Sequence, residues 1–371
     1  MAINTKKIVR YLAAFILFCI FVELTARFDD WVEYDAPFWG TYSSLRLRSW
    51  DDEGTRINIP NGDFEKWKNN SAGFRGPEIS MEKRPGVTRI VCLGASESYG
   101  LYESPGMEWP AQLRMELDST KFEIINVASV GLPMVQYVDY LRKYVMKYSP
   151  DAAILYIEPV SYVAARERAI NNPESIIKNP KQQQAARQLG IRGKLNAWFR
   201  AVPKLQRAIK QFLPSSIMAE YNRRAAEEMV QSAELTYLKG MTPLDDVPSE
   251  IIEEYKTELK KIIAFLLENN CQPILCTYPS LIDGGMNDDN MTMLLEARRF
   301  VVELSLEGMA NTARRLNEAN RGVAEVEHLP LIELENAVPR TTEYFADNVH
   351  YTDTGAEIVA RTIADFLRTN L

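Results

Sequence analysis

The chain has 371 residues, of which 46% are hydrophobic and 25% charged, a composition typical of a globular protein that buries a core. It excludes a disordered or collagen-like chain. Because 50 acidic residues outweigh 43 basic ones, for a net charge of −7, we expect no nucleic-acid partner. Four cysteines are too few for a disulfide scaffold and match no zinc motif, so we expect neither a metal nor a cofactor.

Residues 1–27 predict a cytoplasmic tail and a transmembrane anchor. Tyr11–Val22 is a nearly continuous apolar run, and its apolar neighbours extend it to about 17 residues, the short limit for a spanning helix. Three basic residues precede the run, whereas Arg27 is followed by four acidic residues before position 36. The positive-inside rule therefore predicts that the N-terminus lies in the cytoplasm and the main domain outside it, which is the periplasm if the cell is Gram-negative.

A cleaved signal peptide is the competing interpretation of the same segment. Thr25-Ala26 is not preceded by a good pattern of small residues for cleavage, and Phe18 before Cys19 spoils a lipoprotein signal. We therefore favour an uncleaved anchor that contacts membrane lipid.

Residues 28–88 form an aromatic-rich extension with little periodicity. They hold four of the six tryptophans, namely Trp31, Trp39, Trp50 and Trp67. We favour packing of this extension onto the main domain and the bilayer surface, and stacking on carbohydrate is the alternative.

From residue 89 onward, short apolar runs alternate with helical periodicity, which predicts an α/β fold with a parallel sheet. Cys92 and Cys276 fall inside two of the runs, where a free thiol behaves as a small hydrophobe. The expected strands are Arg89–Leu93, Phe122–Val127, Ala152–Ile157, Pro273–Tyr278 and a weaker one near Val323–Leu329. The expected helices are Met107–Leu117, Val135–Tyr148, an apolar face running from Ile251 to Leu266, Met291–Ala319 as one long or broken helix, and Thr354–Leu367.

A basic segment, Arg166–Arg224, interrupts this alternation within an expected helical insertion at about residues 165–249. It carries thirteen Lys and Arg against three Glu, a charge of +10. Apolar residues from Leu195 to Phe212 recur at helical spacing, although Pro203 must kink or restart the helix. Such a helix favours contact with anionic lipid headgroups or with another membrane protein, and a solvated face over a local core is the alternative. The basic residues between its apolar positions are Arg200, Lys204, Arg207 and Lys210.

Only two histidines are present, so a histidine-dependent reaction has few candidates. His328 lies in an apolar run before Leu329-Pro330, which favours a structural role. His350 lies just before the last expected helix, and Asp347 three residues earlier can fold back to accept the imidazole Nδ1 proton. That contact would leave Nε2 free as a base.

The candidate nucleophile is Ser96, in a small-residue turn directly after the first expected strand. In open α/β sheets, reacting groups gather at the carboxyl ends of strands, where a following N–H can also stabilise an oxyanion. We therefore expect the Ser96 hydroxyl to lie within hydrogen-bond reach of His350 Nε2. Taken alone, Gly-Ala-Ser after a strand is equally an ordinary turn.

Together these segments resemble the SGNH/GDSL hydrolase superfamily, specifically its bacterial membrane-anchored members. The resemblance covers about residues 70–367 outside the basic insertion. It implies a three-layer, flavodoxin-like parallel sheet over residues 89–371. It also implies Ser96 as nucleophile, His350 as general base, Asp347 as its orienting carboxylate, and the N–H groups of Ser96 and Gly131 as oxyanion donors. The blocks that carry it are Asn70–Gly76, Leu93–Ser96 with Gly100, Asn126–Gly131, Pro150-Asp151 and Asp347–His350.

Two positions depart from the pattern of that superfamily. Its first-block Asp is Ala95 here, which alters local hydrogen bonding rather than chemistry. Its third-block Asn, an oxyanion donor, falls on Val160, whose side chain donates nothing. Losing one such donor costs on the order of a hundredfold or more in rate in a comparable hydrolase. Either Ser161, Asn126 or a partner protein substitutes, or activity is low or absent.

The leading function is therefore an anchored, extracytoplasmic serine esterase or acyltransferase. The resemblance to anchored members implies acyl or acetyl groups of an envelope or secreted glycan as substrate. Hydrolysis and transfer share one acyl-enzyme and differ only in the acceptor. The alternative is a catalytically inactive subunit of a membrane complex that keeps the same fold.

Overall fold

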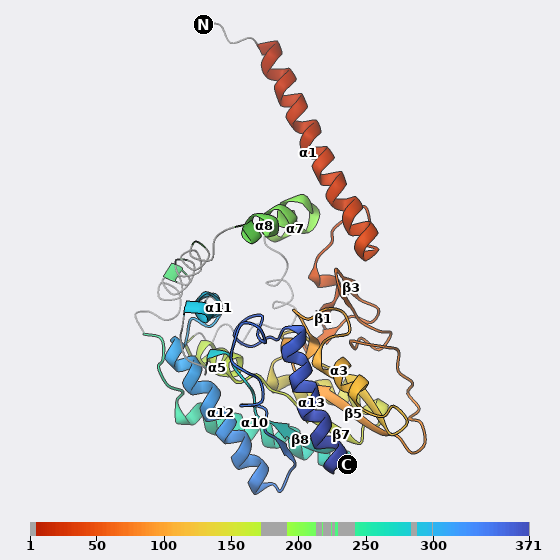
Figure 1. Ribbon diagram of the computed structural model, residues 1–371, viewed down its shortest axis with the longest axis vertical. Coiled ribbons are helices and arrows are strands. Elements are labelled where there is room, and N and C mark those ends of the chain that lie inside the picture. The colour runs from red at the N-terminus through yellow and green to blue at the C-terminus, as the bar shows by residue number, and fades with distance from the viewer. Residues whose placement is uncertain are drawn as a thin grey trace.

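The structure is a computed structural model that describes residues 5–171, 191–212, 242–282, 288–298 and 300–370, together with 217, 224, 227 and 228. Within them, a parallel sheet lies at the centre of the main body, and a long N-terminal helix, α1 (Thr5–Tyr34), projects away from it (Figure 1). The part of the basic segment between 171 and 191 and most of 213–241 lie outside the described residues.

The central sheet has five strands in the order β6-β5-β7-β8-β9, and all neighbouring pairs are parallel. In chain order this is 2-1-3-4-5, the flavodoxin-like order that was expected. The switch point of such a sheet lies beyond the carboxyl ends of its first and third strands, here β5 and β7. The strands are β5 (Thr88–Leu93), β6 (Phe122–Asn126), β7 (Ala152–Leu155), β8 (Gln272–Cys276) and β9 (Leu331–Ile332).

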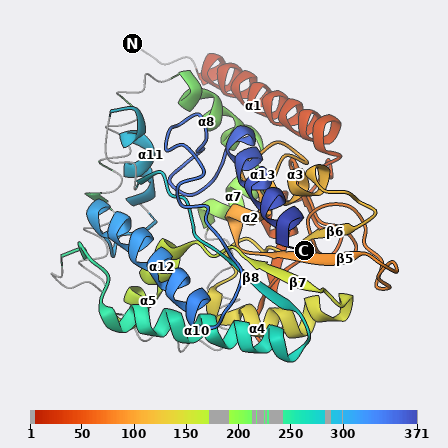
Figure 2. The ribbon, with the colours of Figure 1, turned by 60° about the horizontal axis from the view of Figure 1, so that its bottom comes forward.

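Alternate strand residues feed two separate cores, so the domain has three layers. On β5, Ile90 and Cys92 face one core and Val91 and Leu93 face the other, as the two-residue period of a strand requires. Figure 2 shows helices on both sides of the sheet. One layer holds α3 (Trp109–Glu116) and α13 (Asp353–Asn370). The other holds α4 (Tyr137–Tyr140), α5 (Pro159–Asn171), α10 (Ser249–Glu268) and α12 (Leu306–Val326).

The last expected strand, near Val323–Leu329, is wrong. Helix α12 continues to Val326, because Leu316, Ala319 and Val323 recur at helical spacing and are all buried. His328 is exposed and has φ of 53°, so it lies in the turn that follows this helix. The strand itself, β9, begins only after Pro330.

Two expected helices are interrupted. The expected helix Met291–Ala319 is broken into α11 (Asp288–Arg298) and α12, and the Ser305 hydroxyl caps α12 by accepting the Gly308 N–H at 3.0 Å. The expected helix Val135–Tyr148 is a chain of short turns with changing hydrogen-bond period: a 3-10 turn (Met134–Gln136), α4, a π-helical turn (Leu141–Val145) and a second 3-10 turn (Met146–Tyr148).

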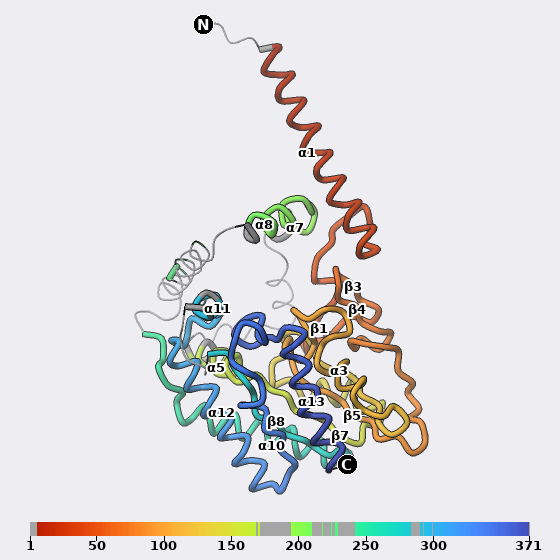
Figure 3. Tube along the Cα trace, in the orientation of Figure 1, coloured from red at the N-terminus to blue at the C-terminus, as the bar shows by residue number. Residues whose placement is uncertain are grey.

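The aromatic-rich extension forms small antiparallel hairpins between α1 and the sheet domain (Figure 3). Trp67 packs against the sheet domain and donates a hydrogen bond from its indole N–H to the Gly100 carbonyl at 3.3 Å. Trp31 and Trp39, in contrast, are exposed. Its elements are the 3-10 turn Ser44–Arg46, β1 (Arg48–Trp50), β2 (Arg56–Asn58), β3 (Asp63–Phe64) and β4 (Trp67–Lys68).

Two helices of the basic segment lie beside the C-terminal part of α1. They are α7 (Ile191–Trp198) and α8 (Ala201–Phe212). Pro203 restarts the helix, as expected, because it lies in the first turn of α8, where its missing N–H breaks no intrahelical hydrogen bond.

Helix α1 is long and apolar enough to cross a membrane. Its apolar side chains from Ile8 to Val22 are exposed. By length and composition, the helix is consistent with a signal-anchor or with a signal peptide.

Candidate active site

Ser96 follows β5 at the switch point of the sheet and begins α2 (Ser96–Tyr99). The turn that carries it requires glycine at position 94, because a Cβ there would lie 2.2 Å from the Ser98 hydroxyl oxygen and 2.8 Å from the Tyr156 carbonyl oxygen. Ser96 itself is only partly buried. The sequence therefore places a reachable hydroxyl at the carboxyl edge of the sheet.

Asp347 and His350 form the contact that the sequence predicted. Asp347 Oδ2 lies 2.7 Å from His350 Nδ1, and Asp347 Oδ1 accepts the backbone N–H groups of Val349 and His350 at 2.9 and 2.8 Å. Burial of the Asp347 carboxylate raises its pKa, but the hydrogen bond from His350 and the two backbone N–H groups outweigh burial, so the pKa is lowered. A carboxylate held ionised in this way fixes the proton on Nδ1 and turns Nε2 into the basic nitrogen.

His350 Nε2 is buried and has no hydrogen-bond partner among the described residues. The direct hydrogen bond from Ser96 to His350 that we expected is therefore not formed in this structure. The segment after Ser96 nevertheless lies against the imidazole, since the Tyr102 ring centroid is 5.1 Å from that of His350. Catalytic hydrogen bonds are often long without substrate and shorten only in the complex.

Tyrosines that sequence reasoning missed hold the histidine turn onto the sheet. Tyr351 is buried, and its hydroxyl shares a hydrogen bond with that of Tyr156, just beyond β7. Tyr278, beyond β8, donates its hydroxyl to the Val349 carbonyl at 2.6 Å. Two strand ends therefore position the residue before His350 and the residue after it. The spacing of apolar residues in the sequence does not predict these hydrogen bonds of the tyrosine hydroxyls.

Three buried glutamates, Glu97, Glu103 and Glu158, lie close enough to His350 for their charges to interact, and sequence reasoning missed all of them. Burial raises the pKa of Glu97 to about 7 and that of Glu103 to about 7, and it also raises the pKa of Glu158. The charge of His350 opposes the rise in each case. Burial lowers the pKa of His350, but Asp347 and the charges of Glu97 and Glu103 raise it more, so the pKa lies above its ordinary value.

The candidate oxyanion donors lie in the loop after β6 and at the start of α5. The Ser129 N–H donates to the Gly94 carbonyl at 3.3 Å, which places the loop of Gly131 beside the serine turn. Gly131 is exposed, with φ of 73° and open space where a Cβ would lie. Asn126 is engaged elsewhere, because its amide donates to the Ser98 carbonyl at 2.8 Å and accepts the Ala128 N–H at 3.1 Å.

At the start of α5, the carboxylate of Glu158 accepts the backbone N–H groups of Val160 and Ser161, both at 2.8 Å. The Val160 side chain is 1% exposed and belongs to the core on the α10 side of the sheet. Ser161 is exposed, and its hydroxyl opposes, without cancelling, the rise in the pKa of Glu158 that burial causes. An asparagine at position 160 would have to bury its amide in that core to take the same place.

The block Asn70–Gly76 places Arg75 against α2, the short helix that begins at Ser96. The Asn70 side-chain oxygen accepts the N–H groups of Ala72 and Phe74 at 3.0 and 2.9 Å, which shapes the turn. Arg75 is then buried, with Nε 3.3 Å from Glu108 Oε2 and its guanidinium 5.1 Å from the Tyr99 ring centroid. This block therefore stabilises α2 through the contact of Arg75 with Tyr99 and does not supply a reacting group.

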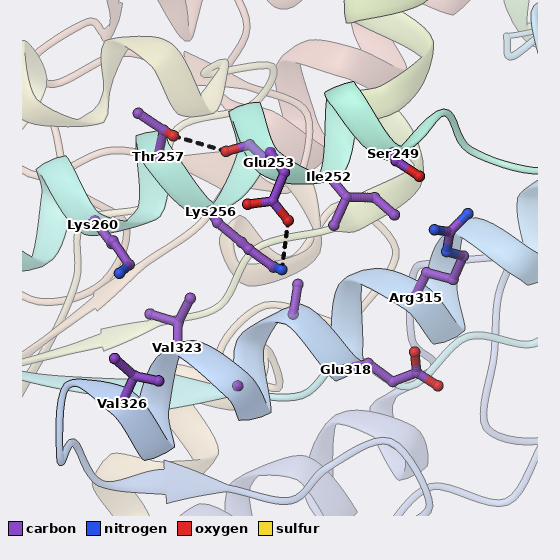
Figure 4. Close-up of a pocket in the computed structure, with 12 residues that line it drawn as sticks. Ser249, Ile252, Glu253, Lys256, Thr257, Lys260, Arg315, Glu318, Val323 and Val326 are labelled. Carbon is purple, nitrogen blue, oxygen red and sulfur yellow. Dashed lines mark hydrogen bonds and ion pairs between the residues drawn. The ribbon is translucent and has the colours of Figure 1, made fainter.

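A cavity of about 640 Å³ lies elsewhere, between α10 and α12 (Figure 4). Its walls mix charged and apolar side chains, with Lys256 Nζ bound to Glu253 Oε1 at 2.8 Å, and it includes neither Ser96 nor His350. In the part of the chain that the structure describes, no three His, Cys, Asp or Glu side chains are grouped so as to hold a metal ion.

No family model and no curated protein sequence matches this chain. Among solved structures, it is similar to a member of the lipolytic protein G-D-S-L family from Veillonella parvula, with 11% identity and a TM-score of 0.41 over 77% of this chain and 100% of that one. A lipase/acylhydrolase from Enterococcus faecalis gives 14% identity and 0.41 over 77% and 97%. An acetyl-xylooligosaccharide esterase from Geobacillus gives 13% and 0.41 over 76% and 94%.

Proposed function

We propose that this chain is a membrane-anchored serine esterase or acyltransferase of the SGNH type, with Ser96 as nucleophile, His350 as general base and Asp347 as its orienting carboxylate. The observation that carries the proposal is the Asp347–His350 contact, which leaves a buried imidazole Nε2 without a partner beside the loop that begins with Ser96. An imidazole held in this tautomer is the arrangement that serine hydrolases need.

The reaction proceeds through a covalent acyl-enzyme. His350 Nε2 takes the Ser96 hydroxyl proton while Oγ attacks the ester carbonyl, and the resulting oxyanion accepts hydrogen bonds from the N–H groups of Ser96 and Gly131. Collapse expels the alcohol, which receives the proton from His350. Water or a sugar hydroxyl then attacks the acyl-enzyme by the same steps in reverse.

The substrate that we propose is an acyl or acetyl ester of an envelope or secreted glycan. The resemblance of the sequence blocks to anchored superfamily members supports this choice. Anchoring by α1 agrees with it, since the basic residues before the apolar run favour a cytoplasmic N-terminus and an extracytoplasmic catalytic domain.

A catalytically inactive subunit of a membrane complex is the second candidate. Two observations favour it: Val160 stands in the core where the superfamily has an oxyanion donor, and no hydrogen bond joins Ser96 to His350. In that case the fold would serve binding alone.

A serine-reactive fluorophosphonate probe distinguishes the two candidates. We expect labelling of the full-length protein at Ser96, and loss of labelling in the Ser96→Ala and His350→Ala variants. Ser104→Ala is the matched control, because Ser104 is exposed in the same loop and its backbone N–H, not its hydroxyl, contacts Asp353 at 2.6 Å. A folded protein that stays unlabelled would instead favour the subunit.

A further inference from the structure

An apolar groove of about 660 Å³ separates α1 from α7 and α8. One wall is α1, with Phe18, Cys19 and Val22, and the other is the α7–α8 pair. From the second wall Trp198, Phe199, Val202 and Leu205 line the groove, and Trp39 of the extension adds a further aromatic side chain.

The α7–α8 pair leaves an apolar face uncovered. Val202, Leu205 and Ile209 follow one another at helical spacing on α8 and are 46%, 62% and 52% exposed. Trp198 and Phe199 continue this face from α7 and are also exposed. Trp198, Phe199, Val202 and Leu205 line the same groove as the exposed apolar side chains of α1.

Polar contacts fix the α7–α8 pair onto α1. The Glu23 carboxylate accepts the backbone N–H groups of Arg200 and Ala201 at 3.2 and 3.0 Å, so that a side chain of α1 caps the start of α8. Arg27 is buried between α1 and the α7–α8 pair. Its guanidinium binds Glu23 at 2.7 Å and donates to the Trp198 carbonyl. These hydrogen bonds and this ion pair therefore fix the position of α7 and α8 relative to α1, and with it the shape of the groove.

The basic residues of α8 turn toward acidic groups of this chain. Lys204 pairs with Asp29 and, at 2.8 Å, with Asp30, while Arg207 pairs with Glu65 at 3.0 Å. Arg200 is buried with Asp30 at 3.6 Å. The charges of these three cations are therefore matched within the protein, which argues against their use in binding anionic headgroups. The side chain of Lys210, the fourth basic residue named above, lies outside the described residues.

The depth of the groove along α1 matches the outer boundary of a bilayer. Phe18 lies six residues before Leu24, the last residue of the apolar run, which corresponds to about 9 Å along a helix. Interfacial helices bury their apolar faces roughly 5–10 Å into the boundary between headgroups and acyl chains. The apolar side chains of α7 and α8 stand at this level of α1.

We propose that α7 and α8 rest on the outer leaflet of the bilayer, with lipid acyl chains filling the groove against α1, and so hold the catalytic domain at the membrane surface. This inference rests on the anchor in the proposed function, but not on its chemistry. Apolar burial supplies the attraction, so binding does not require anionic lipid.

An environment-sensitive fluorophore on a single cysteine tests the placement. The full-length chain carries Cys19→Ala, since Cys19 is the one exposed cysteine and the other three are buried. The dye is placed by Leu205→Cys on the apolar face, by Gln206→Cys on the adjacent exposed polar position, and by Leu12→Cys within α1. Each variant is reconstituted in phosphatidylcholine vesicles with and without doxyl-labelled lipid.

The dye at position 205 should show a blue shift and quenching by doxyl lipid, whereas the dye at position 206 should show neither. Added salt or phosphatidylglycerol should leave the quenching at 205 unchanged. Equal quenching at 205 and 206, or quenching at neither while position 12 is quenched, would overturn the proposal and leave the anchor standing. Quenching that salt abolishes would also overturn it, since headgroup charge would then be the attraction.

Discussion

Glu97, the residue after the candidate nucleophile, turns its carboxylate back to accept the backbone N–H of Ala95 at 2.7 Å. Ala95 has no polar side chain of its own, so the neighbouring carboxylate satisfies the backbone N–H of this turn. The carboxylate is 2% exposed and close enough to His350 for their charges to interact. The turn that presents Ser96 therefore contains a carboxyl group whose pKa burial raises to about 7.

The first prediction concerns stability in the Glu97→Gln variant. Burial raises the pKa of Glu97 from 4.5 to about 7, so the folded state favours the protonated form. The contribution of protonated Glu97 to the free energy of unfolding is fully present below about pH 4.5. It is lost as the pH rises through 7, and the loss is on the order of 3 kcal/mol. Because glutamine keeps the acceptor but cannot ionise, the variant should unfold at a higher temperature than the parent near pH 8 and at a similar temperature near pH 4.5.

Thermal unfolding of the full-length protein at both pH values measures this difference. Glu82→Gln is the matched control, because Glu82 is exposed and should change stability little at either pH. A variant that is equally or less stable than the parent near pH 8 would count against a neutral Glu97 in the fold.

The second prediction concerns the pH dependence of acylation. His350 acts as a base only when neutral, so the labelling rate of Ser96 should rise with pH through the His350 pKa. That pKa is raised by Asp347 and by the charges of Glu97 and Glu103, against the opposing effect of burial. The rise should therefore be centred above the ordinary imidazole value of about 6.5.

The Glu97→Gln variant should move that rise toward lower pH, because one of the negative charges that favour the protonated imidazole is gone. Fluorophosphonate labelling rates across the pH range measure both profiles. Coincident profiles for parent and variant would show that Glu97 does not act on His350.

The third prediction is that Asp347→Asn slows acylation by roughly a hundredfold to ten-thousandfold, as the loss of an orienting carboxylate does in a comparable triad. An amide can still accept the two backbone N–H groups, so the turn should survive, but the imidazole loses the acceptor that fixes its tautomer. Labelling kinetics give the rate. Asp365→Asn, on the exposed side of α13, is the control and should label at the parental rate.

The strand positions could be predicted from sequence because buried parallel strands are short apolar runs with sharp ends. Leu93 and Asn126 end β5 and β6 close to the expected positions. The strand expected near Val323 failed because a run that is apolar at helical spacing continues α12. In a short window, apolar content alone does not separate a buried strand from the end of a buried helix.

In the candidate site, too, some contacts could be predicted from the sequence and others could not. Asp347 and His350 are three residues apart, so their contact is local and the spacing predicts it. The charges of Glu103 and Glu158 interact with His350 only because separate loops pack together, and Val160 belongs to the core because of the course of α5. Sequence spacing does not encode such tertiary approaches.

The fourth prediction is that the mature protein keeps the residues before Arg27. Cleavage near Ala26 would remove Glu23, which caps α8, and would leave Arg27 without its ion-pair partner. Protein extracted from the membrane fraction should therefore retain its N-terminal segment by intact mass and by N-terminal sequencing. A mature chain that begins near Arg27 would show that the apolar run is a signal peptide.

The last prediction is that Glu23→Gln loosens α8 without unfolding the sheet domain. The Glu23 carboxylate accepts, through different oxygens, the N–H of Ala201 at the start of α8 and that of Arg200 just before it, and it also binds Arg27. Glutamine offers one acceptor oxygen and no charge, so at least one N–H loses its acceptor and the Arg27 guanidinium loses its ion pair, at a local cost of about 1–3 kcal/mol.

Hydrogen exchange by mass spectrometry of the reconstituted full-length protein measures this cost locally. Amides of α8 should exchange about tenfold faster or more in the variant, since each 1.4 kcal/mol of opening free energy corresponds to a factor of about ten. Amides of β5 and β7 should keep their protection, because Glu23 contacts neither strand. Glu33→Gln, an exposed position on the same helix, should leave α8 unchanged. Equal exchange of α8 in the Glu23 and Glu33 variants would mean that other contacts, such as Lys204 with Asp30, hold the helix in place.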